Sequence, residues 1–191
     1  MRIDEWNQRY RSGERGEERH PAPVVQRFAS ALAPGRAQDL ACGAGRHAIY
    51  LAQLGLDVTA VDGSPAALSI VEERAAQTAG RVRTVVADLE EDGSVLEPAG
   101  FDLILDCYYL QRSLFPAIRA GTRPGGMVIA IVHIPAAGEQ PNEKRAAPGE
   151  LRSFFAAWRI LHDYEGPTRD AAHRQPVAEI VASRLQKRPV C

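Results

Sequence analysis

The sequence has no excess of charge of either sign. Its 191 residues include 23 Lys and Arg and 24 Asp and Glu, which give a formal net charge of -1. Proteins that bind nucleic acid usually carry a clear basic excess, because they must neutralise phosphates. We therefore expect no nucleic-acid partner. A chain of this length is long enough for one domain, residues 1–191, with a sizeable core.

Long apolar segments are missing as well. No apolar run approaches the roughly 20 residues needed to cross a bilayer, and residues 1–6 are polar, without the apolar core of a secretory signal. The three cysteines, Cys42, Cys107 and Cys191, are widely spaced and show no metal-ligand spacing. We therefore expect a cytoplasmic monomer or homodimer with no metal site and no membrane partner.

The most informative stretch that is present begins at Asp39. A short apolar run leads through Gly43 and Gly45 into residues 46–54, where alanine, isoleucine and leucine follow a helical spacing. A strand that ends in a glycine turn and feeds a helix lets the backbone approach a ligand closely. The helix N-terminus then offers free N–H groups to an acidic ligand. A Gly-x-Gly pattern alone is a weak signal, so its context matters.

Acidic residues follow the next two apolar runs. Asp62 directly follows the apolar run of residues 58–61, and Asp88 comes two residues after the run of residues 82–86. An acidic residue about 20 residues after such glycines is where the ribose hydroxyls of an adenosine-containing ligand are held. Asp88 could accept from the adenine amino group. The alternatives are that Asp62 caps the following helix and that Asp88 is a solvated turn carboxylate.

Strand and helix patterns alternate along the chain. This alternation predicts an α/β fold: a doubly wound, mostly parallel seven-stranded sheet with an antiparallel C-terminal strand. Residues 1–33 form either a helical lid over a ligand or a packing segment, and residues 123–126 read as a sharp turn. Besides the runs above, we expect strands at 101–105, 127–132, 160–164 and 177–185, and helices at 24–32, 65–78, 113–120 and 151–158.

Four motifs, taken in order, resemble those of class I S-adenosylmethionine-dependent methyltransferases. Residues 45–52, 109–116 and 148–151 look closer still to the small tellurite-resistance-like and thiopurine-methyltransferase-like branch, which acts on small molecules. His47 stands where this family usually has asparagine. The motifs are Asp39-x-x-Cys42-Gly43-x-Gly45, Val61-Asp62-x-Ser64, Ala87-Asp88-Leu89 and Arg123-Pro124-Gly125-Gly126.

The resemblance implies S-adenosylmethionine as the cofactor and a small-molecule acceptor. Residues 35–134 would be the cofactor-binding core and residues 135–191 the substrate-side portion. Asp39 would orient the turn or receive the ammonium of the cofactor, and Arg46 would approach the carboxylate of the cofactor unless it is a solvent-facing helix residue. The implied cofactor-binding residues are Asp39, Ala41, Gly43, Gly45, Arg46, Asp62, Gly63, Asp88, Leu89 and Asp106.

Candidates for the acceptor chemistry follow the expected fourth and fifth strands. Methyl transfer is an in-line displacement at an activated sulfonium methyl, so the protein mainly aligns the nucleophile and excludes water. Tyr109 or His133 could deprotonate or orient the acceptor, and Arg112 could bind an anionic one. His133 could instead be a structural histidine, and Tyr109 a wall aromatic. The acceptor stays open between a thiol, a selenium or tellurium oxyanion, and similar small molecules.

Two other functions are compatible with the sequence. Residues 43–48 also satisfy the Gly-x-Gly-x-x-Gly/Ala fingerprint of a nicotinamide-dependent oxidoreductase. Asp39, Asp88 and the short length left for a substrate domain argue against that reading. The second alternative is a module that binds S-adenosylmethionine without catalysing a reaction. The sequence determines the acceptor-side residues least, so turnover, measured as S-adenosylhomocysteine production with a panel of small acceptors, separates these functions.

Overall fold

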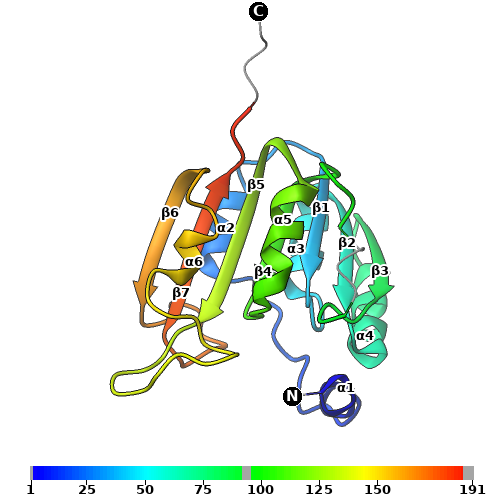
Figure 1. The fold of residues 1–191 in the computed structure, drawn as a ribbon. Helices are drawn as coiled ribbons and strands as arrows, with labels where there is room; N and C mark the ends of the chain where they lie inside the picture. The colour runs from blue at the N-terminus through cyan, green and yellow to red at the C-terminus, as the bar shows by residue number, and fades with distance from the viewer. Residues whose placement is uncertain (1, 92–95, 187–191) are drawn as a thin grey trace, which may run out of the picture.

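The computed structural model describes residues 2–91 and 96–186, so Cys191 lies outside the described residues. Within them, one sheet runs through the middle of the molecule in the order β3-β2-β1-β4-β5-β7-β6 (Figure 1). Every pairing is parallel except those of β7, which runs antiparallel to both neighbours. The expected α/β sheet is confirmed. Its strands are β1 (Arg36–Leu40), β2 (Asp57–Asp62), β3 (Arg81–Val86), β4 (Phe101–Cys107), β5 (Thr122–His133), β6 (Arg159–Gly166) and β7 (Val177–Ser183).

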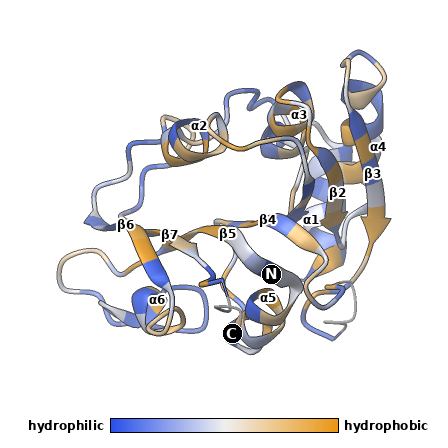
Figure 2. Cartoon of the chain, turned by 90° about the horizontal axis from the view of Figure 1, so that it is seen from above, coloured by the Kyte–Doolittle hydropathy of each residue, from blue (hydrophilic) through white to orange (hydrophobic). Residues whose placement is uncertain are grey.

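Helices cover both faces of the sheet. Seen from above, α2 (Pro23–Ala29) and α3 (Arg46–Gln53) lie on one side, and α5 (Phe115–Gly121) and α6 (Glu150–Ser153) on the other (Figure 2). The helix α4 (Pro65–Ala75) packs on β2 and β3 beside α3. Two buried apolar clusters result, one on each face. The chain is therefore doubly wound, as expected.

The central strands are apolar on both faces. Leu103, Ile104 and Ile129 in β4 and β5 are fully buried, because a parallel sheet covered by helices has no solvated side. The strand β1 differs, since it buries Gln38 and Asp39. Polar groups inside a sheet are costly to bury, so their presence in β1 indicates a functional or hydrogen-bonding requirement.

Several elements differ in length from the sequence prediction. The helix expected at 151–158 is only α6, followed by turns, and the N-terminal helix is α1 (Ile3–Arg11). The prediction of a sharp turn at 123–126 was wrong, because these residues belong to β5. The register shifts between Phe101 and Leu103, and Gly125 has φ +82. Glycine at a positive φ allows this irregularity without ending the strand.

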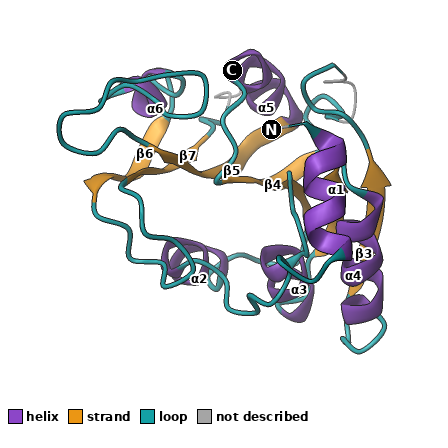
Figure 3. Ribbon diagram, turned by 90° about the horizontal axis from the view of Figure 1, so that it is seen from below, coloured by secondary structure: helices purple, strands orange, loops and turns teal. Residues whose placement is uncertain are grey.

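The carboxyl ends of β1, β2, β4 and β5 share one edge of the sheet. In Figure 1 the helix α1 lies below this edge, and from below it lies beside α4 (Figure 3). Because β6 runs parallel to β5, the segment that connects β6 to β7, residues 167–176, also begins at this edge. Two segments that are far apart in the sequence, α1 and residues 167–176, therefore border the same edge.

Two absences can be stated for the described residues. None of their helices is both long and apolar enough to span a bilayer. The same part of the chain contains no group of three or more His, Cys, Asp or Glu side chains that could hold a metal ion.

Candidate functional site

The turn between β1 and α3 depends on left-handed backbone conformations. Ala41, Gly43 and Gly45 have φ of 48, 54 and 75 degrees. A Cβ on Gly45 would lie 2.7 Å from Cγ2 of Val71, a core residue of α4. A side chain at position 45 would therefore displace α4 as well as strain the backbone. The glycine lets α3 begin directly behind the turn.

Asp62 ties this turn to the start of α4. Its Oδ2 accepts from the N–H of Gly43 at 2.8 Å, and its Oδ1 accepts from the N–H of Ser64 at 2.8 Å. The N-cap of α4 is Ser64, whose hydroxyl accepts from the N–H of Ala67, so Asp62 does not act as the helix cap. Burial raises the pKa of Asp62, and the backbone N–H groups oppose that rise.

Two further carboxyl groups are buried at the ends of neighbouring strands. Asp39 is 1% exposed and Asp106 is 0% exposed. Within the described residues, Oδ2 of Asp39 and both oxygens of Asp106 have no hydrogen-bond partner. Burial raises the pKa of Asp39 to about 7, although the N–H of Ala48 and the charge of Arg46 lower it. Burial also raises the pKa of Asp106. Such orphaned acids require either a proton or a donor from a ligand.

The remaining predicted cofactor residues lie beside β2 and β3. Oδ1 of Asp88 accepts from the N–H of Glu90 at 2.9 Å, so this carboxylate shapes the turn after β3. Leu89 is buried in the cluster on the α5 face. A Cβ on Gly63 would lie 2.7 Å from Cδ1 of Ile3 in α1. The N-terminal helix therefore packs directly on the end of β2.

The helix α1 contacts the site through one of its faces, which the sequence analysis missed. Oδ1 of Asn7 accepts from the Ser64 hydroxyl at 3.0 Å and from the N–H of Ala66 at 2.9 Å. The Tyr10 hydroxyl lies 2.5 Å from where a Cβ on Gly43 would be. The signal was present in the spacing of residues 3, 7 and 10, which places them on one helix face.

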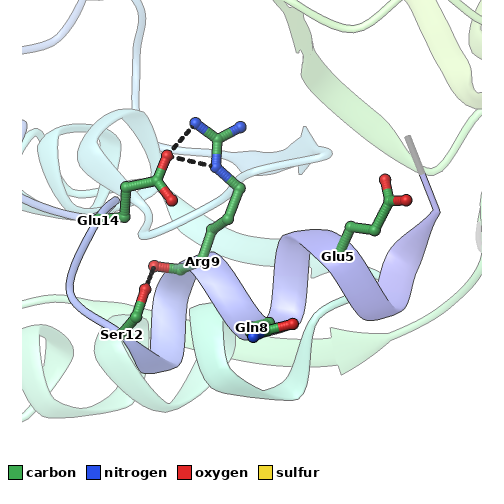
Figure 4. A pocket seen from close by; sticks show the side chains of 5 residues that line it. All are labelled: Glu5, Gln8, Arg9, Ser12 and Glu14. Carbon is green, nitrogen blue, oxygen red and sulfur yellow. Dashed lines mark hydrogen bonds and ion pairs between the residues drawn. The ribbon is translucent and has the colours of Figure 1, made fainter.

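The other face of α1 borders a shallow hollow of about 350 Å³ (Figure 4). Arg9 pairs there with Glu14, its Nε lying 2.7 Å from the carboxylate, and the Ser12 hydroxyl donates to the carbonyl of Arg9. The residues around this hollow all belong to α1 and the segment after it. It contains none of the side chains at the carboxyl edge, so we do not include it in the site.

Arg74 and His47 hold residues 12–22 across the glycine turn. The Arg74 guanidinium donates to the carbonyl of Ala44 at 2.6 Å, to that of Glu18 at 3.3 Å, and to that of Gly16. Nε2 of His47 accepts from the N–H of Ala22 at 3.2 Å. Burial lowers the pKa of His47 to about 3, so this histidine is a neutral acceptor. These are backbone contacts, which no side-chain motif could predict.

A second polar cluster lies at the start of α3. Arg46 binds Asp170 through both terminal nitrogens, at 2.7 and 3.2 Å, and its side chain is only 11% exposed. Arg46 is therefore not a solvent-facing helix residue. The Tyr108 hydroxyl donates to the same carboxylate at 2.7 Å. The Tyr108 ring stacks on His173, with centroids 3.5 Å apart. Sequence reasoning missed both Asp170 and His173.

The predicted acceptor-side residues do not form one group. His133 lies beside Tyr108, with ring centroids 5.5 Å apart, and its Nδ1 is buried with no hydrogen-bond partner among the described residues. Burial lowers the pKa of His133 and raises that of Tyr109. At neutral pH, His133 is thus able to accept a proton, and Tyr109 keeps its own.

Arg112 is bound by the loop of residues 135–149 and by α6. Its Nε donates to Oε1 of Glu150 at 2.6 Å, and its terminal nitrogens donate to Oε2 of Glu150 and to the carbonyls of Asn142 and Glu143. Arg112 therefore holds the loop of residues 135–149 against α6. The described cysteines, Cys42 and Cys107, are free and buried, and burial raises the pKa of both thiols.

The chain is similar to known proteins in both sequence and structure. Residues 37–126 match the family model described as "Methyltransferase domain". The chain is 31% identical over 148 residues to Hemagglutinin 1 of Eikenella corrodens, an alignment that covers 72% of this chain and 48% of that protein. The chain thus spans about half the length of this relative.

Two solved structures share the fold. TehB from Haemophilus influenzae superposes with a TM-score of 0.72 at 22% identity, over 86% of this chain and 62% of TehB. The 1,6-didemethyltoxoflavin-N1-methyltransferase of Burkholderia thailandensis, solved with bound S-adenosylhomocysteine, has a TM-score of 0.68 at 21% identity, over 96% and 87% of the two chains. The chain thus shares its fold with these two structures, and its residues 37–126 resemble a methyltransferase domain.

Proposed function

We propose that this protein transfers the methyl group of S-adenosylmethionine to a small-molecule acceptor. The observation that most supports the proposal is the pair of buried acids, Asp39 and Asp106, with unpaired oxygens beside the glycine turn. A cationic ammonium group fits such oxygens. The pyrophosphate of a nicotinamide dinucleotide does not, because it would bring negative charge toward buried carboxyl groups. The family match favours the same conclusion.

The proposed roles of the turn residues follow from their positions. Ala41, Gly43 and Gly45 would face the methionine part of the cofactor with backbone, and Asp62 would accept from the ribose hydroxyls. Asp88 and Leu89 would border the adenine at the end of β3. When bound, S-adenosylmethionine supplies a sulfonium-activated methyl group. The protein then has to orient the acceptor and exclude water.

We place the acceptor beside His133 and Tyr108. The neutral imidazole of His133, with its unpaired Nδ1, could take a proton from an oxygen or nitrogen acceptor. A thiolate would need no base. Arg112 is paired with Glu150, and we assign it no direct contact with the acceptor, which stays open between a thiol, a selenium or tellurium oxyanion and similar small molecules. Tyr109 would contribute a wall of the pocket.

Calorimetric titration with S-adenosylmethionine, with NAD and NADP in parallel, tests the cofactor. We expect micromolar binding of S-adenosylmethionine alone. An acceptor screen for S-adenosylhomocysteine production, using thiols, selenols and oxyanions, then tests turnover. Binding of a nicotinamide nucleotide instead would refute the proposed function and leave the fold unchanged. Cofactor binding without turnover of any acceptor would favour the non-catalytic binding module.

We propose that, of residues 1–33, α1 and the segment up to residue 22 act as a lid, whereas α2 packs on a face of the sheet. Ile3, Asn7 and Tyr10 contact the end of β2, the start of α4 and the glycine turn, which together form the edge that the cofactor would occupy. These contacts lie at the carboxyl edge and not on a face of the sheet. The proposed lid would exclude water during methyl transfer.

Replacing Arg74 with methionine tests how this lid is held. The change removes the donors to Gly16, Glu18 and Ala44 and keeps most of the aliphatic packing of the side chain. We expect trypsin cleavage after Arg15 and Arg19 to accelerate about tenfold, because loss of these hydrogen bonds favours opening of the segment. S-adenosylmethionine should slow the cleavage in the wild type.

The exposed Arg27→Met variant is the matched control for this test, since Arg27 lies on α2 outside the contacts of Arg74. Its cleavage rate should equal that of the wild type. Equal rates of trypsin cleavage in the wild type, Arg74→Met and Arg27→Met would show that Arg74 does not hold residues 12–22.

A further inference from the structure

Asp170 joins two parts of the site that are distant in the sequence. It lies in residues 167–176, between β6 and β7, and is 7% exposed. Its carboxylate accepts two hydrogen bonds from Arg46, at 2.7 and 3.2 Å, and one from the Tyr108 hydroxyl, at 2.7 Å. The N–H of Ala172 is a fourth donor, at 3.0 Å. No sequence motif includes Asp170.

The local backbone fixes the direction of this carboxylate. The N–H of Asp170 donates to the Thr168 hydroxyl at 3.1 Å, and its carbonyl accepts from the N–H of His173 at 3.0 Å. The His173 ring in turn stacks on Tyr108, with an angle of 4° between the ring planes. The segment is thus attached to the residue after β4 at two points, through Asp170 and through His173.

The Asp170 carboxylate remains ionised at neutral pH. Burial raises its pKa, but the hydrogen bonds from Arg46 and Tyr108 outweigh this effect and lower the pKa to about 2. A carboxylate that binds a guanidinium through two parallel hydrogen bonds fixes the plane of the guanidinium as well as its position. Removing one partner of such a buried pair leaves the other charge without compensation.

Both partners of Asp170 occupy positions where a small displacement matters. Arg46 follows Gly45 directly and opens α3, so its main chain belongs to the glycine turn. Tyr108 follows β4 and has φ +65, a conformation that side-chain-bearing residues rarely adopt. Such a conformation persists only when the surroundings hold it. The bond to Asp170 and the stacking on His173 are contacts that do so.

We propose that Asp170 is a positioning residue for S-adenosylmethionine binding: it holds Arg46 at the methionine end of the cofactor site and Tyr108 between that site and the acceptor. This inference rests on the proposed function. Because Arg46 is proposed to approach the carboxylate of the cofactor, Asp170 should affect recognition of the amino-acid part of S-adenosylmethionine and leave recognition of the nucleoside part unchanged.

Calorimetric titration with two ligands separates these parts. 5′-Methylthioadenosine has the same nucleoside as S-adenosylmethionine but lacks the amino-acid carboxylate and ammonium. In Asp170→Asn we expect S-adenosylmethionine to bind about 10- to 100-fold more weakly. The affinity for 5′-methylthioadenosine should stay within about twofold. Asp170→Glu keeps the negative charge and should recover part of the lost affinity.

The control variant is Asp163→Asn. Asp163 is exposed on β6, where it pairs with Arg152 at 2.6 Å, away from Arg46 and Tyr108. The Asp163→Asn variant makes the same change from carboxylate to amide, a few residues before the segment of residues 167–176. We expect it to leave the affinities for both ligands unchanged.

The possible outcomes distinguish the proposals. If Asp170→Asn loses affinity for both ligands by the same factor, Asp170 only supports the fold. Unchanged affinity of this variant for S-adenosylmethionine would also overturn the positioning role. If the wild type binds neither ligand, the proposed function itself fails. Should Asp170→Asn not fold, Asp170→Glu makes the test, because it keeps the charge and displaces the bidentate pair with Arg46. It should show a smaller loss with the same selectivity for S-adenosylmethionine.

Discussion

Replacing Asp39 with asparagine is expected to stabilise the ligand-free protein at about pH 8 and to weaken S-adenosylmethionine binding. The folded-state pKa of Asp39 is about 7, raised by burial from the model-peptide value of 3.8. The folded state therefore holds this proton more tightly than the unfolded state, so the stability from this group is full below about pH 4 and is lost as the pH rises to about 7. Asparagine removes that loss.

The size of the effect follows from the pKa shift. The ionised Asp39 costs the folded protein about 4 kcal/mol above about pH 7. We expect part of this, ~1–2 kcal/mol, to be recovered in Asp39→Asn, because the amide brings its own unpaired donor into the same site. Urea unfolding of wild type and variant between about pH 5 and pH 8 measures the difference.

The same substitution should flatten the pH dependence of cofactor binding. An ammonium group that meets Asp39 binds best to the ionised carboxylate, so wild-type affinity for S-adenosylmethionine should rise between about pH 6 and pH 8 with release of a proton. Asp57→Asn is the matched control, since Asp57 is exposed at the opposite end of β2. A parallel pH dependence in wild type and Asp39→Asn would contradict the assignment.

Replacing Asp62 with alanine is expected to reduce the binding free energy of S-adenosylmethionine by ~1.5–3 kcal/mol, which lowers the affinity about 10- to 150-fold. The substitution removes the proposed acceptor for the ribose hydroxyls. It also leaves the N–H groups of Gly43 and Ser64 without the partners they have at 2.8 Å. The free energy of unfolding should therefore fall by ~1–3 kcal/mol as well.

Two ligands distinguish this effect from that of Asp170. The ribose is present in both S-adenosylmethionine and 5′-methylthioadenosine, so Asp62→Ala should lower the affinity for both ligands by a similar factor. Asp62→Asn keeps one carbonyl oxygen that can accept, and it should lose less stability than alanine. Unchanged affinity for both ligands in a folded Asp62→Ala protein would limit Asp62 to shaping the turn.

Most of the sheet could be predicted from local patterns. Apolar runs of strand length, separated by helical spacings, identified β2, β4 and β5, because strands buried on both faces are continuously apolar. The edge strand β3 was predicted as well, although it is only partly buried. The boundaries were less accurate where tertiary contacts decide them. Residues 123–126 carry turn signals, yet the N–H of Gly125 donates to the carbonyl of Arg184 after β7, which keeps this stretch within the sheet.

The cofactor side and the acceptor side of the site differ in how well sequence spacing predicts them. The glycine turn, Asp39 and Asp62 follow one another within a short stretch, so spacing alone placed them at one edge. On the acceptor side, spacing did not distinguish Tyr108 from Tyr109. Tyr108, and not its neighbour Tyr109, lies beside His133, because the positive φ of Tyr108 turns the chain at the end of β4.

Local sequence patterns specify the alternation of strands and helices, the glycine turn and the acids that follow the strands. These are local properties, since they depend on side-chain periodicity and on the conformations that glycine allows. Which side chains meet across the edge depends on how the whole chain packs. The pairs Arg46–Asp170 and Tyr10–Gly43 join residues whose distance in space depends on the strand order and on where α1 and residues 167–176 fold back. No sequence spacing encodes those distances.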